Sequence, residues 1–315
     1  MVQGQSRFAD RIAQYIFFAC AILLVLIIAG VILFIASQAF RVFSESGGAS
    51  IQQFFTTTIW DPTGGAHSDA AGNPVPYYGA LGLIIGSVVT TLLAVLIATP
   101  LSFAVALFFT ELSPRWMANL LQPLIEIFTG MPSVVVGFLG LVLLVPTLRN
   151  VVLPITGGLQ TGGYGWGAAT IVLIVMILPT IISVSIDTLR AVPMSVREAS
   201  LALGSTRWQM MWRAVLPAAS AGLGTAVVLG MARAIGEAIA VALVLGGSNF
   251  PTKHVFSLAV FFQPNVNITQ QIVNDFGDSS GPARDAFFTL AFLLLVISFL
   301  FICISRYLAS RSVYR

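Results

Sequence analysis

Charged residues are scarce in this chain. Aspartate, glutamate, lysine and arginine together make up 9% of its 315 residues, whereas 57% of the residues are hydrophobic. A soluble globular domain has about 25% charged residues, so this composition excludes an ordinary soluble protein and indicates an integral membrane protein. The formal net charge of +3 is no sign of nucleic-acid binding, because the basic residues are spread singly between apolar runs.

The residues that covalent chemistry and metal binding need are also few. The one lysine is Lys253 and the motif G-x-x-x-x-G-K-[ST] is absent, so this chain has no P-loop to hydrolyse ATP. The motif H-E-x-x-H does not occur either. His67 and His254 have no cysteine or carboxylate at metal-ligand spacing, and Cys20 and Cys303 lie in separate apolar runs. We expect no enzyme activity, metal, cofactor or disulfide.

Six long apolar runs predict membrane-spanning helices, because about 20 residues at a rise of about 1.5 Å each cross the hydrocarbon core of a bilayer. A signal peptide is the competing interpretation of the first run, but its apolar region would be about 7–15 residues long, which is too short. The sequence therefore predicts an all-α integral membrane helical bundle with six transmembrane helices and a single domain, 1–315. The expected spans are about 12–40, 79–110, 120–146, 166–186, 218–247 and 286–305.

Several short patterns predict local features of these runs. Gly82 and Gly86 form a G-x-x-x-G, which permits close helix approach. Residues 130–133, Gly-Met-Pro-Ser, interrupt the third run, and Pro179 predicts a kink in the fourth. Residues 51–55 predict a short interfacial helix in the first loop.

Six spans place both termini on one side of the membrane, and the basic residues indicate which side. Loops rich in arginine and lysine face the cytoplasm under the positive-inside rule. The side with the termini has ten basic residues and the other side has four. We therefore expect both termini and segment 190–217 to be cytoplasmic. The ten are Arg7, Arg11, Arg115, Arg190, Arg197, Arg207, Arg213, Arg306, Arg311 and Arg315, and the four are Arg41, Arg149, Lys253 and Arg284.

Segment 190–217 is the one long polar stretch in the apolar C-terminal half. Ser195 and Glu198 stand in S-x-x-E spacing, which predicts a capping box at the start of a short helix. Gly204 then predicts a left-handed end of that helix. An ordinary amphipathic loop at the membrane surface is the competing interpretation.

The second half of this segment repeats the pattern. Thr206 and Gln209 have the capping spacing and predict a second short helix. Pro217 predicts the next boundary. The segment therefore predicts a helix, a glycine turn and a helix between two membrane spans.

Arg233 and Glu237 lie in the fifth run at i, i+4 spacing, so a continuous helix would place them on one face. A charged side chain at the bilayer centre costs about 2.5–3.5 kcal/mol on insertion scales, and pairing the two would reduce that cost. They either line a pathway for an oxyanion, which the planar guanidinium suits, or form a structural ion pair. Glu126 in the third run either hydrogen-bonds the broken backbone at 130–132 or has a transport role.

The polar segment resembles the EAA motif of bacterial ABC importer permeases, in which glutamate and two alanines precede a glycine and then Leu-Pro. Ser200 replaces the second alanine, and Ala214 stands where isoleucine is usual. The resemblance implies that this segment couples the chain to an ATPase. The matching residues are Glu198, Ala199, Ser200, Gly204, Leu216 and Pro217.

A narrower resemblance, to the phosphate-specific ABC transporter permease of PstC type, covers most of the chain from Phe54 to Gly247. Residues 233–238, Arg-Ala-Ile-Gly-Glu-Ala, are similar to the R-A-x-G-E segment of that family, in which threonine is commoner than Ala238. The other matching stretches are Phe54-Phe55, Trp60-Asp61-Pro62, Tyr78-Gly79-Ala80-Leu81 and Glu126 followed by Met131-Pro132-Ser133-Val134.

The resemblance implies a type I importer of inorganic phosphate in the bacterial plasma (inner) membrane. Its implied partners are a second permease subunit of PstA type, an ATP-binding subunit dimer, an extracytoplasmic phosphate-binding protein and the lipid bilayer. This chain would form half of the pore, with Arg233, Glu237 and Glu126 in the substrate pathway, and would bind no nucleotide and no nucleic acid. Two alternatives stay open: a permease for another oxyanion or solute, and an ion-coupled secondary carrier, which would not need ATP.

Overall fold

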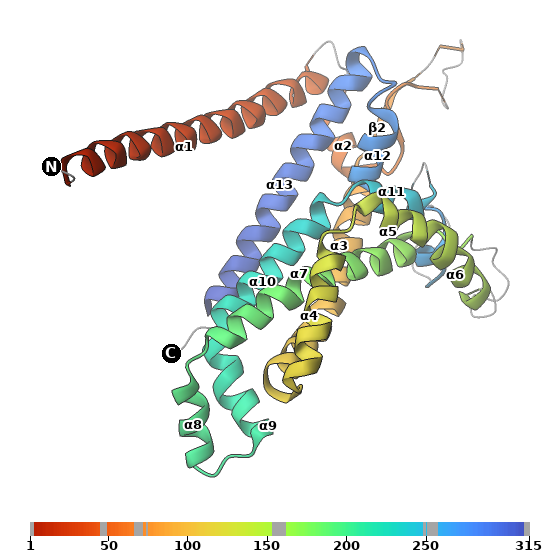
Figure 1. The fold of residues 1–315 in the computed structure, drawn as a ribbon. Coiled ribbons are helices and arrows are strands. Elements are labelled where there is room, and N and C mark those ends of the chain that lie inside the picture. The colour runs from red at the N-terminus through yellow and green to blue at the C-terminus, as the bar shows by residue number, and fades with distance from the viewer. Residues whose placement is uncertain are drawn as a thin grey trace.

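The computed structural model describes residues 3–44, 49–65, 72–73, 75–152, 162–247, 250 and 258–311, and this part of the chain is almost entirely helical (Figure 1). The α-helices are α1 (Gln3–Ala39), α2 (Ile51–Thr56), α3 (Leu81–Leu107), α4 (Arg115–Thr129), α5 (Ser133–Leu139), α6 (Val145–Val152), α7 (Trp166–Ala191), α8 (Met194–Ala202), α9 (Arg207–Met210), α10 (Leu216–Gly236), α11 (Ile239–Leu245), α12 (Ile268–Asp275) and α13 (Gly281–Arg311). The strands are β1 (Trp60–Asp61) and β2 (Tyr77–Tyr78). The 3₁₀ segments are η1 (Arg41–Phe43) and η5 (Leu258–Phe262), and the π-helical turns are η2 (Phe108–Leu112), η3 (Gly140–Leu144) and η4 (Met211–Val215).

Six stretches of the described residues are long and apolar enough to cross a membrane, which confirms the predicted number. The third begins at Ser133 and not at residue 120, and the fifth begins at Arg207 and ends at Gly236, before residue 247. Helix breaks divide both of these predicted spans. The six stretches are Asp10–Phe43, Leu81–Leu112, Ser133–Val152, Trp166–Ala191, Arg207–Gly236 and Gly281–Tyr307.

The break in the third predicted span lies where its sequence indicates. α4 ends at Thr129, and α5 begins at Ser133 after a C-cap at Gly130 and an extended Pro132. Proline disfavours the helical conformation in the residue before it, so the chain leaves α4 ahead of Pro132. In Figure 1, α5 and α6 consequently run at a steep angle to α4.

The fifth predicted span is broken as well, which the sequence did not lead us to expect. α10 ends at Gly236, and Glu237 adopts an extended conformation with φ −79° and ψ 109°. The chain resumes a helical course at Ile239 in the short helix α11. The two candidate charges of this span therefore lie on either side of a helix end.

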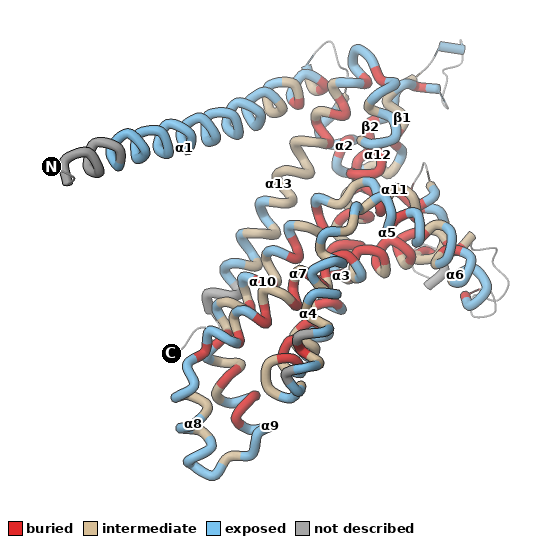
Figure 2. Tube along the Cα trace, in the orientation of Figure 1, coloured by how far each residue is buried: buried red, intermediate tan, exposed pale blue. Residues whose placement is uncertain are grey.

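The core lies where α3, α7, α10 and α13 meet. α3 packs along α7, and α10 packs against both α7 and α13. Leu83, Leu173, Ile177 and Leu290 are among the fully buried side chains, and Figure 2 shows the buried residues gathered along α3, α7 and α10. This bundle separates the end with α8 and α9 from the end with α2, β2 and α12 (Figure 1).

α1 stands apart from the bundle. It projects away from the other helices (Figure 1), and its residues 10–34 are exposed (Figure 2). Its contacts with α13 are at its C-terminal end, where the Thr289 hydroxyl donates to the main-chain oxygen of Ala39 at 2.7 Å and the rings of Phe34 and Phe288 lie 5.8 Å apart. An exposed apolar helix of this length needs lipid or protein around it.

Two predictions for the region before and along α3 are tested by the structure. The short helix expected at 51–55 is confirmed as α2, which buries Phe54. Gly82 and Gly86 do allow close approach: added Cβ atoms would lie 2.6 Å from Phe250 Cβ and 2.0 Å from the Val266 oxygen. These two groups belong to the connection between α11 and α12, and Trp166 at the start of the spanning helix α7 also approaches Gly86, with its Nε1 3.0 Å from the added Cβ.

Candidate functional site

Arg233 lies in the last turn of α10 and is half-buried. Its guanidinium donates to the main-chain oxygen of Thr129 from Nη1 at 3.4 Å and from Nη2 at 3.3 Å, and Nη1 also donates to Thr180 Oγ1 at 3.3 Å. Thr129 is the last residue of α4, and Thr180 follows Pro179 within α7. Arg233 thus connects α10 to α4 and α7, with its positive charge at the negative end of the α4 dipole.

The predicted pairing of Arg233 with Glu237 is wrong. No ion pair joins the two side chains, both of which are described, and Glu237 Oε1 instead accepts from the main-chain N–H of Ala240 at 3.3 Å. The i, i+4 argument requires a continuous helix, and α10 ends at Gly236. The extended conformation of Glu237 turns its side chain towards the start of α11.

Arg233 consequently has no carboxylate partner among the residues that the structure describes. Its three contacts go to neutral oxygens and are long, at 3.3–3.4 Å, compared with about 2.7–2.9 Å for a charge-assisted hydrogen bond. A guanidinium held loosely by neutral acceptors retains most of its capacity to bind an anion. Among the described residues, this cation stands within a candidate membrane span without an opposite charge.

Glu126 lies one turn before Thr129 on α4, and its side chain is exposed. Its carboxylate accepts from Gln122 Nε2 at 3.3 Å. The main-chain oxygen of Glu126 accepts from the N–H of Gly130 at 3.2 Å, so the backbone at the break is satisfied by this carbonyl and not by the carboxylate. Arg233 and Glu126 therefore belong to the same end of α4 without forming an ion pair.

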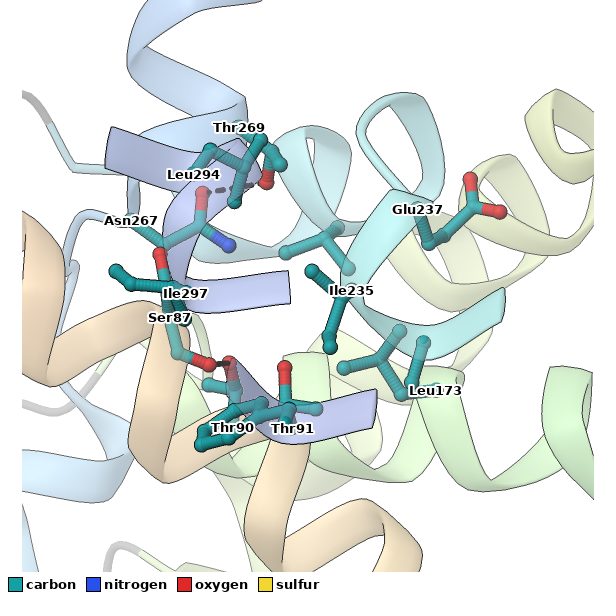
Figure 3. A pocket seen from close by; sticks show the side chains of 13 residues that line it. Ser87, Thr90, Thr91, Leu173, Ile235, Glu237, Asn267, Thr269, Leu294 and Ile297 are labelled. Carbon is teal, nitrogen blue, oxygen red and sulfur yellow. Dashed lines mark hydrogen bonds between the residues drawn. The ribbon is translucent and has the colours of Figure 1, made fainter. Parts of the chain in front are cut away.

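A small cavity lies beside the α10–α11 break, among side chains of α3, α10, α12 and α13 (Figure 3). Its volume is about 10 Å³, which is room for about one water molecule. Hydroxyl and amide side chains of Ser87, Thr90, Thr91 and Asn267 line it, and Figure 3 shows the Glu237 carboxylate directed away from them. The cavity is too small for a tetrahedral anion.

An open apolar groove of about 350 Å³ lies beside the α4–α5 break. It is formed by α4, the break, α5, η3 and α7, and Phe128 and Met131 line it next to Thr129. The groove is therefore adjacent to the carbonyl that holds Arg233.

The segment 190–217 forms the predicted helix, glycine turn and helix. α8 presents exposed Glu198 and Ala199, and Gly204 has φ 78°, which confirms the left-handed end. Ser200, the departure from the EAA pattern, closes the turn: its main-chain oxygen accepts from Ser205 Oγ at 2.7 Å, and the two hydroxyls are 2.8 Å apart.

Two of the four predicted boundaries in this segment need correction. Ser195 and Glu198 form no capping box, because Pro193 is the N-cap of α8 and Ser195 lies inside the helix. Pro217 does not interrupt the helical course, since η4 runs directly into α10. It lies in the first turn of α10, where a residue without an N–H group is tolerated. The Thr206–Gln209 capping box is confirmed, with both reciprocal hydrogen bonds present at 3.2 and 3.0 Å.

Sequence reasoning missed the residues that hold these charges. Thr129 and Thr180 contact Arg233, and Glu111 forms an ion pair with Arg197 on α8. The threonines gave no signal, because isolated hydroxyls in apolar helices commonly bond their own backbone. Glu111 could have been noticed as a carboxylate next to a predicted span end.

The fold and the site together define a multi-pass helical membrane protein with a projecting polar segment between its fourth and fifth spans. The family described as "Binding-protein-dependent transport system inner membrane component" matches residues 98–314. This chain belongs to that family, and it is a multi-pass inner membrane transport permease subunit.

Individual relatives match over most of the chain. It is 40% identical over 312 residues to the "Probable ABC transporter permease protein YqgH" of Bacillus subtilis, covering 98% of this chain and 93% of the relative. It is 35% identical over 271 residues to the "Phosphate transport system permease protein PstC" of Xylella fastidiosa, covering 82% and 78%. A protein of the same description from Haemophilus influenzae is 30% identical, covering 92% and 90%.

Solved structures show the same fold. The crystal structure of a bacterial alginate ABC transporter in complex with an alginate pentasaccharide-bound periplasmic protein contains a similar chain, with a TM-score of 0.60 and 14% identity over 94% of each chain. An inward-facing MetNI methionine ABC transporter has a TM-score of 0.55 and 19% identity, over 74% of this chain and 95% of that chain. At these identities the likeness concerns the fold alone.

Proposed function

We propose that this chain is a transmembrane permease subunit of an ATP-driven importer of inorganic phosphate and forms half of the translocation pore. Relatives described as phosphate transport system permease proteins match it at 30–35% identity over most of its length. The observation that carries the proposal is Arg233, a guanidinium in a membrane span that contacts neutral oxygens and no described carboxylate.

Arg233 offers phosphate its positive charge. A guanidinium can give an oxyanion two parallel charge-assisted hydrogen bonds, which are stronger than the long contacts to Thr129 and Thr180. Phosphate therefore displaces those neutral acceptors. In the empty state, the carbonyl end of α4 holds the arginine, since helix C-termini favour cations. In the empty state Thr129 is therefore the partner of Arg233, in place of Glu237, which the sequence spacing suggested.

The two carboxylates have different places in this pathway. Glu237 keeps the α10–α11 break in shape by accepting from Ala240, and so sets where α10 presents Arg233. Glu126 lies exposed on α4, one turn from Thr129. Its carboxylate makes the electrostatic potential near the arginine more negative. The groove beside the α4–α5 break supports a pathway at the boundary with a second permease subunit of PstA type, because it opens outward from this chain.

The segment 190–217 is the proposed docking surface for the ATP-binding subunit dimer. Its exposed groups include Glu198, Ala199 and Leu203, which is 89% exposed. This function requires the segment and both termini to be cytoplasmic, as the distribution of arginines predicts. The opposite end, with α2 and α12, then faces outward to receive phosphate from an extracytoplasmic binding protein.

Reconstitution of the complete complex in proteoliposomes tests this function. Uptake of radiolabelled phosphate should require ATP and the binding protein, and excess unlabelled sulfate should leave it unchanged. Uptake of sulfate or another solute in place of phosphate would point to a different importer. Phosphate uptake without ATP, driven by an ion gradient, would identify a secondary carrier.

A further inference from the structure

A partly buried ion pair joins the projecting segment to the bundle at its α8 end. Arg197 on α8 donates to Glu111 Oε1 from Nη2 at 2.8 Å and from Nε at 3.1 Å. The side chains of Arg197 and Glu111 are 12% and 8% exposed. Among the residues that the structure describes, no other ion pair joins two side chains. The two members of this pair are 86 positions apart in the sequence.

The same guanidinium also closes the end of α7. Arg197 Nη1 donates to the main-chain oxygen of Val192 at 2.6 Å, and Nη2 donates to that of Leu189 at 2.8 Å. These carbonyls belong to the last turn of α7 and the residue that follows it, and the Leu189 oxygen also accepts from the N–H of Val192 at 3.3 Å. One side chain therefore connects α8 to the ends of both α7 and α3.

The segment around Glu111 is shaped for this contact. Glu111 lies in the π-helical turn η2, which continues α3 and ends at Leu112 before an extended Ser113. A separate apolar cluster surrounds the pair and includes buried Phe109, Leu189, Val192 and Met211. The ends of α3 and α7 and the turn η4 are thus packed together on one side of α8.

α8 places one partly buried apolar side chain, Val196, against this cluster. None of its residues is buried. Arg197 points into the bundle, whereas the next two residues, Glu198 and Ala199, are exposed on the outer side. α8 is therefore held by the five hydrogen bonds of Arg197 together with the partial packing of Val196.

We infer that Glu111 and Arg197 are positioning residues that make α8 move as one body with the ends of α3 and α7. The inference rests on the proposed function, in which the exposed side of α8 binds the ATPase. Displacement of Glu198 by that partner then passes through Arg197 to the two spanning helices. Glu111→Gln removes the charge and should weaken this attachment, because Arg197 then has a neutral amide oxygen and the two carbonyls as its acceptors.

The first test measures phosphate transported per ATP hydrolysed by the reconstituted complex. With Glu111→Gln, the ATPase should still co-purify and hydrolyse ATP, while the transport ratio falls about tenfold, a typical size for coupling between sites. Arg197→Lys keeps the charge but loses the planar fork and should lower the ratio similarly. The double variant should be no worse than either single one, because both remove one interaction.

The matched control is Asp187→Asn. This exposed carboxylate lies on the last turns of α7, close in sequence to Leu189, and its removal should leave the ratio unchanged. Glu111→Asp keeps the charge at a shorter reach and should fall between the wild-type protein and Glu111→Gln. A wild-type ratio in Glu111→Gln would overturn the inference, as would an equal loss in Asp187→Asn.

The second test does not depend on phosphate. Spin labels at Leu112 and Leu203, both exposed, report the distance between η2 and the end of α8 in the assembled complex. ATP should leave this distance unchanged in otherwise wild-type protein and broaden its distribution in Glu111→Gln. A large change in the wild-type background would refute one-body motion. If the wild-type complex moves another solute, the proposed substrate is wrong, while the spin-label readout of the ion pair remains measurable.

Discussion

The guanidinium of Arg233 donates to the main-chain oxygen of Thr129 from both terminal nitrogens, at 3.3 and 3.4 Å. This relationship joins the last turn of α10 to the last turn of α4. It holds a cation at a helix C-terminus, where the dipole favours it by about 0.3–1 kcal/mol. Because the acceptor is neutral, the arginine can exchange it for an anion without breaking an ion pair.

Replacement of Arg233 is the direct test of the pathway. Arg233→Gln should abolish phosphate uptake while the complex still assembles, because the anion loses its guanidinium partner in the last turn of α10. Arg233→Lys should leave a partial defect, since the charge remains but the bidentate geometry is lost. The measurement is radiolabelled phosphate uptake in cells that lack other phosphate transporters.

The control for that experiment is Arg284→Gln, which removes an exposed arginine that lies 5.2 Å from the ring of Phe276, outside the pathway. Its uptake should match that of the wild-type protein. Co-purification of the ATPase reports assembly in every variant. Full uptake with Arg233→Gln, or a loss explained by failed assembly, would reduce Arg233 to a structural connection between helices.

Glu237 should behave as a cap and not as the partner of Arg233. Glu237→Gln retains an oxygen that accepts from Ala240, so uptake should remain close to wild type. Glu237→Ala removes the acceptor and should cost about 0.5–2 kcal/mol of stability, as loss of a helix cap does. Thermal unfolding of the purified complex and phosphate uptake measure the two effects. Equal loss of uptake in both variants would restore a role for the charge.

The glycine turn offers a test of coupling without steric conflict. An added Cβ at Gly204 meets nothing within 4 Å, so the cost of substitution comes from the backbone at φ 78°. Gly204→Val should be penalised by about 1–2 kcal/mol and should misplace α9, which lowers uptake and ATPase binding. Gly204→Asn should be milder, because asparagine tolerates the left-handed region. Wild-type coupling with valine would exclude a docking role for this turn.

The orientation of the chain can be measured by cysteine labelling. Single cysteines at Gly277 and Ser205 should differ: an impermeant thiol reagent added outside should modify the first and not the second. Cys20 and Cys303, which are free, must first be replaced by serine. Gly277 can accept a cysteine without steric conflict, because an added Cβ there meets nothing within 4 Å. The opposite labelling pattern would reverse the predicted orientation.

Asp275 provides a prediction for pH. Desolvation and the nearby charge of Asp278 raise the pKa of Asp275 above its ordinary value of 3.8, while a hydrogen bond from Gln271 lowers it. A raised folded-state pKa means that the native state binds more protons, so stability falls as pH rises from 3.8 through the raised pKa. Asp275→Asn should therefore unfold at a higher temperature than wild type at pH values above this window.

The same comparison at lower pH checks the sign. Below pH 3.8 the carboxyl is protonated in both states, and the advantage of Asp275→Asn should vanish. Asp278→Asn removes one cause of the raised pKa and should give a smaller gain in the same direction. A stabilisation by Asp275→Asn that is equal at all pH values would contradict the electrostatic explanation.

The sequence by itself determined the features that depend on neighbouring residues. Composition and run length were enough for the membrane class and for six spans, because burial in lipid requires long apolar helices. Cap and turn chemistry acts within a few residues, so the Thr206–Gln209 box, the left-handed Gly204 and the break before Pro132 were all predictable. The break after Gly236 was not, since the glycine was the only weak local sign of it.

Only the tertiary structure decided which groups hold the functional charges. Arg233 contacts Thr129 across 104 positions, and Arg197 contacts Glu111 across 86. Such pairings follow from which helices pack side by side and from where each helix ends, and no local pattern carries that information. The unexpected end of α10 separates Arg233 from Glu237, because a side chain one turn away in a helix lies elsewhere once the backbone becomes extended.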